Sequence, residues 1–523
     1  MRIFLSRRKI LLSVFFTSVI VRGVFFLCWL TSPFRYFHRI PGLDMETLLR
    51  FSEWAPGKEF HPLFVVHRIL IYLVWLFNGN EHCIPAVVIL QSLAGAAGAV
   101  MTADLVLMLW GKRKTALCAG IFYALYAPLL LYDFCILQES ITTVLILAGV
   151  WGYVRCRVKH YPSKSALFSG ILLGVSSIGR PVALLLTVIF PVKTFFDGKR
   201  RAAFFMLAGV LMLWSAAGGF NMVFSGSFNP FFRVMSYTVS FHAEKSGAAE
   251  AAPEAAKKKA FHSLTAGLPG RASKFFLAYE MPENLNWYFL RSRMTPLKYL
   301  PGPGLLMPVA LAGFFLLLLR LRRREYLLPA ILVLLALPLA ARDPIGRYRL
   351  HLLPYFVICA SYFFIVLLKN TRGNQLLCAA ALAVSLAVNI LCGARPFFRV
   401  SDHVSWGRAI EAGNGGQPSD ASLKEYFLGW QKSNHSDRSA AVNLITSSLR
   451  SGNTALAVQT CQQGINGPAE EKSIYHYYMA LIYVSAGNFS GAEKELACVR
   501  EHEIPHLKEK IMILRQVVQR KSL

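Results

Sequence analysis

Apolar runs of membrane-crossing length follow one another through the first three quarters of this chain. The hydrocarbon core of a bilayer is about 30 Å thick and needs roughly 20 apolar helical residues to cross it. Eleven runs approach or reach this length, at residues 10–31, 83–110, 115–133, 138–154, 165–180, 181–197, 202–222, 303–320, 327–342, 350–368 and 374–393. With 55% hydrophobic residues among 523, the composition excludes an ordinary soluble protein. The sequence therefore predicts an all-α polytopic membrane protein with about 11 transmembrane helices.

Basic clusters separate many of these runs and indicate how the chain is oriented. Basic loops stay in the cytoplasm, and all the clusters fall on one side if the runs alternate across the membrane. The clusters are residues 7–9, 111–114, 154–158, 198–201, 320–324 and 369–372. We therefore expect the net charge of +28 to orient the chain in the membrane and to contact anionic lipid, and we do not take it as a sign of nucleic-acid binding. We expect a cytoplasmic N-terminus and a first run that is retained as an anchor.

Residues 62–77 are apolar but short, and they contain His67 and Arg68. Counting them as a further span would move the cluster at 111–114 to the outer side. We therefore expect an interfacial helix in the first outer loop, with a true span as the alternative.

This topology divides the chain into a membrane domain, residues 1–395, and an extracytoplasmic helical domain, residues 396–523. The dipeptides Gly452–Asn453 and Gly487–Asn488 lie 35 residues apart, close to the 34-residue period of tetratricopeptide repeats, which the tail resembles. Cys461 and Cys498 are the cysteines of this tail, and a disulfide between them is an option in an oxidising compartment. The repeat alignment does not place these two cysteines at equivalent positions, which favours free thiols.

The expected outer loops of the membrane domain are residues 32–82, 131–140, 223–302 and 341–351.

Carboxylates in these outer loops are the first candidates for chemistry. They are Asp44, Glu46, Glu59, Asp133 and Glu139. Paired carboxylates suit the deprotonation of an acceptor or the binding of a divalent ion. The plain alternative is that outer carboxylates are simply solvated. For Asp44, which follows the first span at the membrane surface, the functional interpretation is favoured.

Arginines near the same surface are candidates for binding a phosphate. Arg347 and Arg349 lie at the start of the tenth run, and Arg180 lies between two short apolar runs. Their paired donors suit a phosphate group, but arginines at span ends also snorkel to the interface or cap a helix. Arg22 and Asp104 lie within spans, where a charge is costly, and each must find a partner.

The order of short segments resembles that of the C-type (GT-C) membrane glycosyltransferases over roughly residues 1–395. Within that superfamily it is similar to bacterial relatives of protein O-mannosyltransferases and of lipid A aminoarabinose transferases, in which a tetratricopeptide-like tail is common. The segments are an outer loop with an Asp after the first span, HPLFVVHRILIYLVWLFNG, LQSLAGAAGAV, GKR, FYALYAPLLLYDFCILQES, GILLGVSSIGRP, YEMPENLNWYF and IGRYRLHLLPY.

This resemblance implies transfer of a sugar from a polyprenyl-phosphate donor to a protein, lipid or glycan at the outer face of a bacterial inner membrane. It implies that Asp44 is the base or orients the acceptor, and that Asp133 or Glu139 is the second acidic residue. Arg347 and Arg349 resemble the lipid-phosphate contact of the family. Met45 interrupts the adjacent Asp-Glu pair of the mannosyltransferases, which puts the substrate assignment in doubt.

Other positions carry the resemblance more weakly. Glu59 resembles an acidic residue that some relatives place before a Pro-Pro-Leu sequence, and Glu280 and Asn284 belong to an acceptor or donor loop. Family members differ in their use of metal, so a divalent ion is an option that this sequence does not require.

Two functions without catalysis remain as alternatives. A flippase or transporter of lipid-linked glycans is expected to show internal repeats and binding residues at the membrane midplane. A membrane scaffold would use the tail to bind a protein partner. The short outer-loop segments that follow the order seen in the glycosyltransferases favour an enzyme over these two alternatives.

Overall fold

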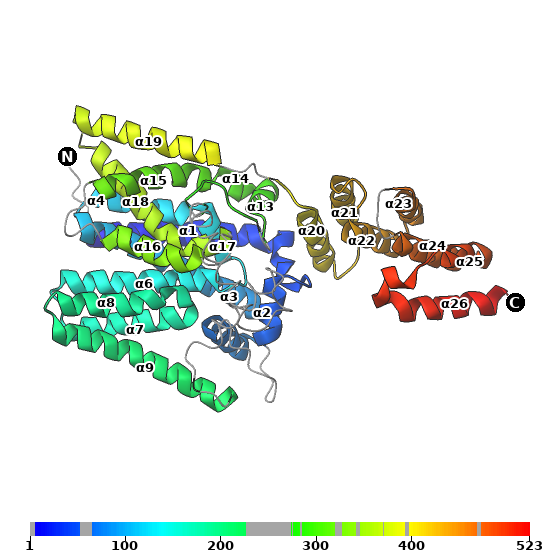
Figure 1. Ribbon diagram of the computed structural model, residues 1–523, viewed down its shortest axis with the longest axis horizontal. Coiled ribbons are helices and arrows are strands. Elements are labelled where there is room, and N and C mark those ends of the chain that lie inside the picture. The colour runs from blue at the N-terminus through cyan, green and yellow to red at the C-terminus, as the bar shows by residue number, and fades with distance from the viewer. Residues whose placement is uncertain are drawn as a thin grey trace, which may run out of the picture. The chain divides into compact units, whose positions relative to one another are not determined.

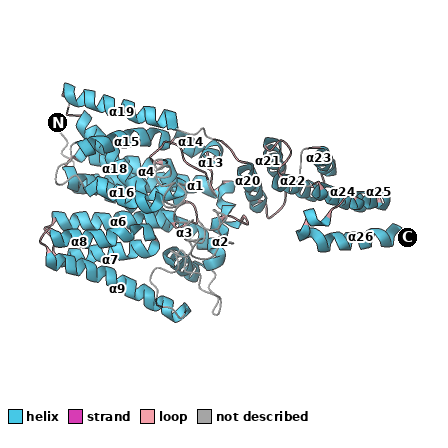
Figure 2. Ribbon diagram, viewed as in Figure 1, coloured by secondary structure: helices cyan, strands magenta, loops and turns pink. Residues whose placement is uncertain are grey.

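The chain folds as an assembly of helices. The computed structural model describes residues 6–52, 65–225, 228, 274, 276–282, 285–319, 327–340, 346–369, 371–392, 397–467 and 472–522. Within these ranges every regular element is a helix and none is a strand (Figure 2). The prediction of an all-α protein is confirmed.

Two compact units make up the chain. The membrane unit comprises Met1–Cys28 and Thr47–Pro396, and the tail unit comprises Trp29–Glu46 and Phe397–Leu523. The sequence led us to expect a single boundary near residue 395. It gave no indication that the segment after the first span groups with the tail.

Long helices lie side by side in the membrane unit (Figure 1). In chain order the helices that lie in this unit, wholly or in part, are α1 (Arg7–Leu30), α2 (Asp44–Ser52), α3 (Val65–Trp110), α4 (Arg113–Leu125), α5 (Ala127–Asp133), α6 (Glu139–Val158), α7 (Ser163–Gly179), η2 (Pro181–Ala183), α8 (Leu184–Phe196), α9 (Arg200–Ser225), α13 (Trp287–Arg293), α14 (Thr295–Tyr299), α15 (Pro303–Leu319), α16 (Leu327–Ala340), α17 (Gly346–Arg349), η3 (Leu350–Leu352), α18 (Leu353–Leu367) and α19 (Arg372–Cys392).

All eleven apolar runs of the sequence are helical. Among the described residues, seven stretches are long and apolar enough to cross a membrane, and α4 with α5 forms an eighth that is bent by 52°. The bend follows from Pro128 at the start of α5, because proline lacks an N–H donor and clashes with the preceding turn. The other three runs are the shorter helices α7, α8 and α16, of 17, 13 and 14 residues. A polytopic membrane protein is therefore confirmed.

The structure adds one feature to the first outer loop. Residues from Val65 onward are helical and continue into the next span as the 46-residue α3, of which His82–Trp110 is the stretch that is long and apolar enough to cross a membrane. No proline interrupts residues 65–84, and a helical glycine such as Gly79 costs only about 1 kcal/mol. Pro85 lies within the helix.

Small residues allow the membrane helices to pack closely. A Cβ added to Gly170 of α7 would overlap the backbone of Met206 in α9, and one added to Gly313 of α15 would overlap the carbonyl oxygen of Cys359 in α18. Lipid tails are as apolar as side chains, so close van der Waals contact replaces the hydrophobic effect as the force that joins such helices.

Paired helices build the tail unit, and a segment from the N-terminal part of the chain joins them. The helices are η1 (Pro33–Arg39), α20 (Val400–Gly413), α21 (Asp420–Lys432), α22 (Arg438–Arg450), α23 (Thr454–Asn466), α24 (Ser473–Ser485), α25 (Phe489–Ala497), η4 (Glu501–Glu503), η5 (Pro505–Leu507) and α26 (Lys508–Ser522).

The repeated dipeptides of the tail have the same local structure. Gly452 and Gly487 adopt φ values of 78° and 74°, which favour glycine, and each ends the preceding helix. The following asparagine side chain accepts a hydrogen bond from the backbone N–H three residues on, and so caps α23 in one repeat and α25 in the other. Ala457 and Ala492 are fully buried at equivalent positions. The pairs α22–α23 and α24–α25 are therefore one structural unit repeated.

The short helix η1 packs against α20 within the tail unit. Phe37 meets Trp406 edge to face with ring centroids 5.9 Å apart, and the ring of Tyr36 lies against Gly413. These contacts explain why the segment after the first span groups with the tail.

Cys461 and Cys498 are both free thiols in this structure. Cys461 is buried, and this burial raises the pKa of its thiol to about 12, while Cys498 is exposed.

The close crossing of α15 and α18 can be tested by adding a single methyl group. We expect Gly313→Ala to lower the melting temperature of the detergent-solubilised protein, because overpacking a close contact costs about 1–3 kcal/mol. Gly304→Ala is the matched control, since nothing lies within 4 Å of a Cβ at this position of the same helix. Equal melting temperatures for the two variants would contradict the crossing.

Candidate functional site

Charged side chains are buried inside the membrane unit, where each needs a partner. Asp133 is 3% exposed, Glu139 2%, Glu280 6% and Arg349 2%. Asp133 and Glu139 are therefore not the solvated carboxylates that the plain alternative describes.

Asp133 pairs with Arg22 of α1. The Nε and Nη2 atoms of Arg22 donate to Asp133 Oδ2 at 2.9 and 2.7 Å, and Nη1 donates to Ser18 Oγ at 2.5 Å. Ser140 Oγ donates to the other carboxylate oxygen, Oδ1. Both oxygens of this buried carboxylate are thus satisfied, and the ion pair joins α1 to the turn between α5 and α6.

Helix α3 packs against this turn and is hydrogen-bonded to it. Gln91 Nε2 donates to the carbonyl oxygens of Asp133 and Cys135 at 3.0 and 2.7 Å. A Cβ at Gly95 would lie 2.8 Å from Arg22 Nε, so only glycine leaves room for the ion pair. The glutamine and glycine of LQSLAG therefore position Asp133.

Glu139 is the first residue of α6, and the side chains of two arginines lie beside its carboxylate. Arg180, which ends α7, donates from Nη2 to Glu139 Oε1 at 2.6 Å. Arg347 Nε, on α17, lies 3.9 Å from the same oxygen. The other oxygen, Oε2, is buried and accepts no hydrogen bond from the described residues. Glu139 therefore presents one free acceptor beside two guanidinium groups.

His351 orients Arg180, and the sequence did not single it out. Arg180 Nε donates to His351 Nε2 at 3.1 Å, so the ring proton resides on Nδ1, which lies 2.9 Å from Thr143 Oγ1. Tyr348 also contributes, since the guanidinium groups of Arg180 and Arg347 lie 5.0 and 5.1 Å from the centre of its ring. In the sequence, one pattern could have indicated that Thr143 belongs with Glu139. The two residues are four positions apart, so they share a face of α6.

Arg349 pairs with Glu280, which the sequence placed in the acceptor or donor loop. Arg349 Nη1 also donates to the carbonyl oxygen of Leu277, so the arginine fixes this part of the loop. The Glu280 N–H donates to Tyr288 Oη at 2.9 Å, and burial raises the pKa of that phenol to about 12. Tyr288 is therefore a neutral phenol at neutral pH.

The structure pairs six of the predicted residues in three groups: Asp133 with Arg22, Glu139 with Arg180 and Arg347, and Glu280 with Arg349. In the second group, two guanidinium groups lie beside one carboxylate. Among the described residues, this is the arrangement that suits an anion such as a phosphate.

The remaining predicted residues lie elsewhere. Asp44 and Glu46 belong to the tail unit, half-buried in the first turn of α2, where the helix dipole favours carboxylates. Glu59 and Asn284 lie outside the described residues.

The two charges within the first spans do not pair with each other. Asp104 accepts hydrogen bonds from Arg7, whereas Arg22 pairs with Asp133. Arg7 and Arg22 are 15 residues apart on α1, a rise of about 22 Å, which places the two ion pairs at different depths.

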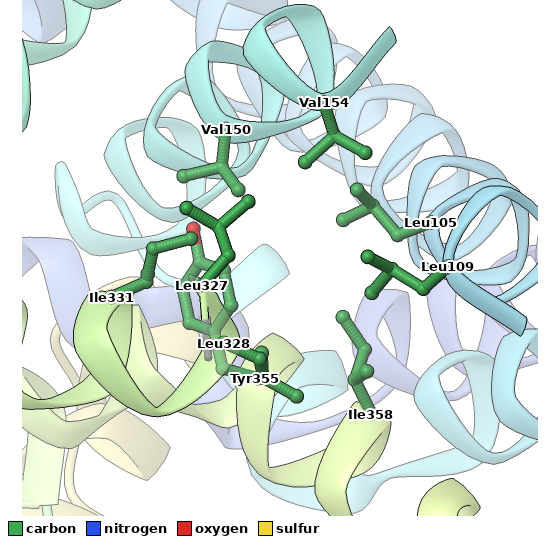
Figure 3. Close-up of a pocket in the computed structure, with 9 residues that line it drawn as sticks. All are labelled: Leu105, Leu109, Val150, Val154, Leu327, Leu328, Ile331, Tyr355 and Ile358. Carbon is green, nitrogen blue, oxygen red and sulfur yellow. The ribbon is translucent and has the colours of Figure 1, made fainter. Parts of the chain in front are cut away.

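An apolar cavity inside the membrane unit is a separate feature. It lies between α3, α6, α16 and α18, and Figure 3 shows its lining, with Tyr355 as the polar side chain. Its volume of about 10 Å³ is close to the least that holds one water molecule. Such a cavity has no room for a sugar phosphate.

The described residues contain no group of three or more His, Cys, Asp or Glu side chains placed to hold a metal ion. The carboxylates of Asp133, Glu139 and Glu280 are each engaged by arginine.

Comparisons with known proteins show a remote similarity to solved structures. No protein-family model and no curated protein sequence matches this chain. A crystal structure of the oligosaccharyltransferase of Archaeoglobus fulgidus, tethered through a disulfide bond to an acceptor peptide containing the NVT sequon, is similar with a TM-score of 0.44 at 12% identity. The similarity covers 93% of this chain and 58% of the archaeal one, so this chain spans little more than half of that protein's length. At this TM-score, function has to be argued from the residues of this chain itself.

The buried ion pair of Arg22 and Asp133 can be tested with a double-mutant cycle. We expect Arg22→Met to destabilise the protein by about 3–5 kcal/mol, because it leaves a buried carboxylate without its partner. Arg22→Met combined with Asp133→Leu should recover most of this loss, measured as the unfolding free energy in mixed detergent.

The half-exposed pair of Lys193 and Asp197 gives the matched control. Lys193→Met should change the unfolding free energy by less than about 1 kcal/mol. If Arg22→Met behaves like Lys193→Met, the charges of Arg22 and Asp133 are not buried together.

Proposed function

We propose that this chain is an integral membrane glycosyltransferase that takes a sugar from a polyprenyl-phosphate donor and transfers it to an acceptor at the outer face of the membrane. The observation that carries the proposal is the buried site in which Glu139 is shared by Arg180 and Arg347, with one carboxylate oxygen left without a partner. The resemblance of the ordered sequence segments to C-type glycosyltransferases points to the same chemistry.

The arginines of this site suit the leaving group. A polyprenyl phosphate has an apolar tail that lies among membrane helices and a charged head that must be bound when the glycosidic bond breaks. The negative charge that develops on the departing phosphate is stabilised by donors that are already in place. Arg347 and Arg180 supply these donors, while Glu139 and His351 hold Arg180 in position.

A carboxylate completes the reaction by taking the proton of the acceptor. We assign this role to Asp44, which follows the first span and begins α2. The nucleophile attacks the anomeric carbon as its proton moves to Asp44, and the bond to the phosphate oxygen breaks. Displacement in one step inverts the anomeric centre, as the resemblance implies.

The tail provides a surface for a protein acceptor or partner. Its repeated helix pairs α22–α23 and α24–α25 form the kind of helical array that binds peptides in tetratricopeptide proteins. We assign the tail to the same side of the membrane as the reaction.

The proposal is tested by turnover of purified protein with polyprenyl-phosphate sugars, followed as release of polyprenyl phosphate. Asp44→Asn should reduce turnover about 10²- to 10⁴-fold, as expected for loss of a general base. Arg347→Lys should reduce it about tenfold or more, because lysine retains the charge but loses the paired donors.

Asp197→Asn is the matched control for the carboxylate, since Asp197 is exposed and lies at the end of α8 away from Arg180. It should leave turnover unchanged. Full activity of a folded Asp44→Asn protein would remove the base assignment, and no turnover of any lipid-linked sugar by the unaltered protein would favour a transporter or scaffold.

Orientation is tested separately through Cys498. We expect a membrane-impermeant maleimide to label this exposed thiol in intact spheroplasts, and Cys498→Ser to remove that label. The buried Cys461 should react only after denaturation. Labelling of Cys498 that required cell lysis would place the tail in the cytoplasm and contradict the proposed topology.

A further inference from the structure

A groove lies between α1, α3 and α6, and its charged end at Arg7 is about 22 Å along α1 from Arg22. Its volume is about 600 Å³, which is ample for the headgroup and first methylenes of a lipid. The wall is apolar on the side of α1 and α3, where it is formed by Leu11, Leu12, Phe15, Val100 and Met101. Residues along α1 such as Phe16 and Ile20 are mostly exposed, so this helix presents an apolar face that needs a lipid cover.

The other wall of the groove is charged. Arg7 donates from Nε and Nη2 to the two oxygens of Asp104 at 2.9 and 2.8 Å, and Trp151 Nε1 donates to Asp104 Oδ2 at 3.0 Å. The guanidinium group of Arg155 lies 4.9 Å from the centre of the Trp151 ring. Asp104 and Trp151 therefore hold two arginines in fixed positions at one end of the groove.

These cations retain capacity for an anion. Arg7 uses two of its five N–H donors on Asp104, and its side chain is 57% exposed. Arg8 is exposed and lines the same groove. Among the described residues that line the groove, three arginines accompany one aspartate, so these side chains carry two more positive than negative charges.

We propose that this groove binds an anionic phospholipid, with its phosphate on Arg7, Arg8 and Arg155 and its acyl chain along Leu11, Leu12 and Phe15. The amphipathic lining selects a lipid over a free anion, because the apolar wall has no counterpart on inorganic phosphate. A basic pocket between membrane helices is the usual form of a site for anionic headgroups. Such a lipid would tie α1, α3 and α6 together at the end of the bundle away from the candidate site.

The test measures lipid retained by the purified full-length protein. After delipidation, the protein is titrated with phosphatidylglycerol or phosphatidylcholine and bound lipid is counted by native mass spectrometry. We expect phosphatidylglycerol to bind more tightly, and Arg8→Gln combined with Arg155→Gln to weaken it about tenfold to thirtyfold. Arg8→Gln alone should give a smaller loss in the same direction, in a variant that alters no structural contact of the groove.

Lys112→Gln combined with Lys114→Gln is the matched control, since these exposed lysines at the start of α4 carry two charges and do not line the groove. It should bind phosphatidylglycerol as the unaltered protein does. Equal binding of the two lipids, an equal loss in the control, or displacement of phosphatidylglycerol by inorganic phosphate at the same concentration would each overturn the proposal.

Discussion

Ion pairs inside an apolar bundle dictate how the membrane unit is assembled. A carboxylate or guanidinium group without a partner is very costly in such a medium, so each must meet its opposite charge. Arg22 with Asp133 joins α1 to the turn before α6, and Glu139 with Arg180 joins α6 to the end of α7. Arg349 with Glu280 fixes a loop segment against α17. The first and third of these pairs connect elements that lie far apart in the sequence, while the second joins the far ends of two consecutive helices.

The same constraint explains how this site can serve chemistry. Buried arginines that are already paired keep their positions without a ligand, so little reorganisation is needed when an anion arrives. Glu139 has one oxygen engaged by Arg180 and one that accepts no hydrogen bond among the described residues. An arrangement of this kind can bind a phosphate through Arg347 while Arg180 remains fixed by Glu139 and His351. In a site that contained only arginines, the guanidinium groups would repel one another and would not keep fixed positions.

How far the sequence could predict this structure depends on whether each signal is local. The eleven helices were predictable, because an apolar run of sufficient length is a property of consecutive residues. The repeat in the tail was equally visible, since Gly452–Asn453 and Gly487–Asn488 carry their own turn and cap. The partner of Arg22 was not predictable, because Asp133 lies 111 positions away and only packing brings them together.

Other features escaped the sequence for related physical reasons. His351 and Thr143 looked like ordinary residues of an outer turn and a span, and their role depends on the position of Arg180. The continuity of α3 was missed because the positions of the basic clusters favoured a separate helix. The candidate site was thus predictable in its residue types and order, while the pairing within it was not.

The segment Trp29–Glu46 has a consequence for how the protein can be divided. It is covalently part of the path from α1 to α2, but it packs with the tail through Phe37 on Trp406 and Tyr36 on Gly413. A cut after residue 396 would therefore not separate the two compact units cleanly. It would uncover the aromatic face of η1, which lies in the segment that leads into α2. Evolution could exchange the tail of such a protein only together with the loop that leads into its proposed base.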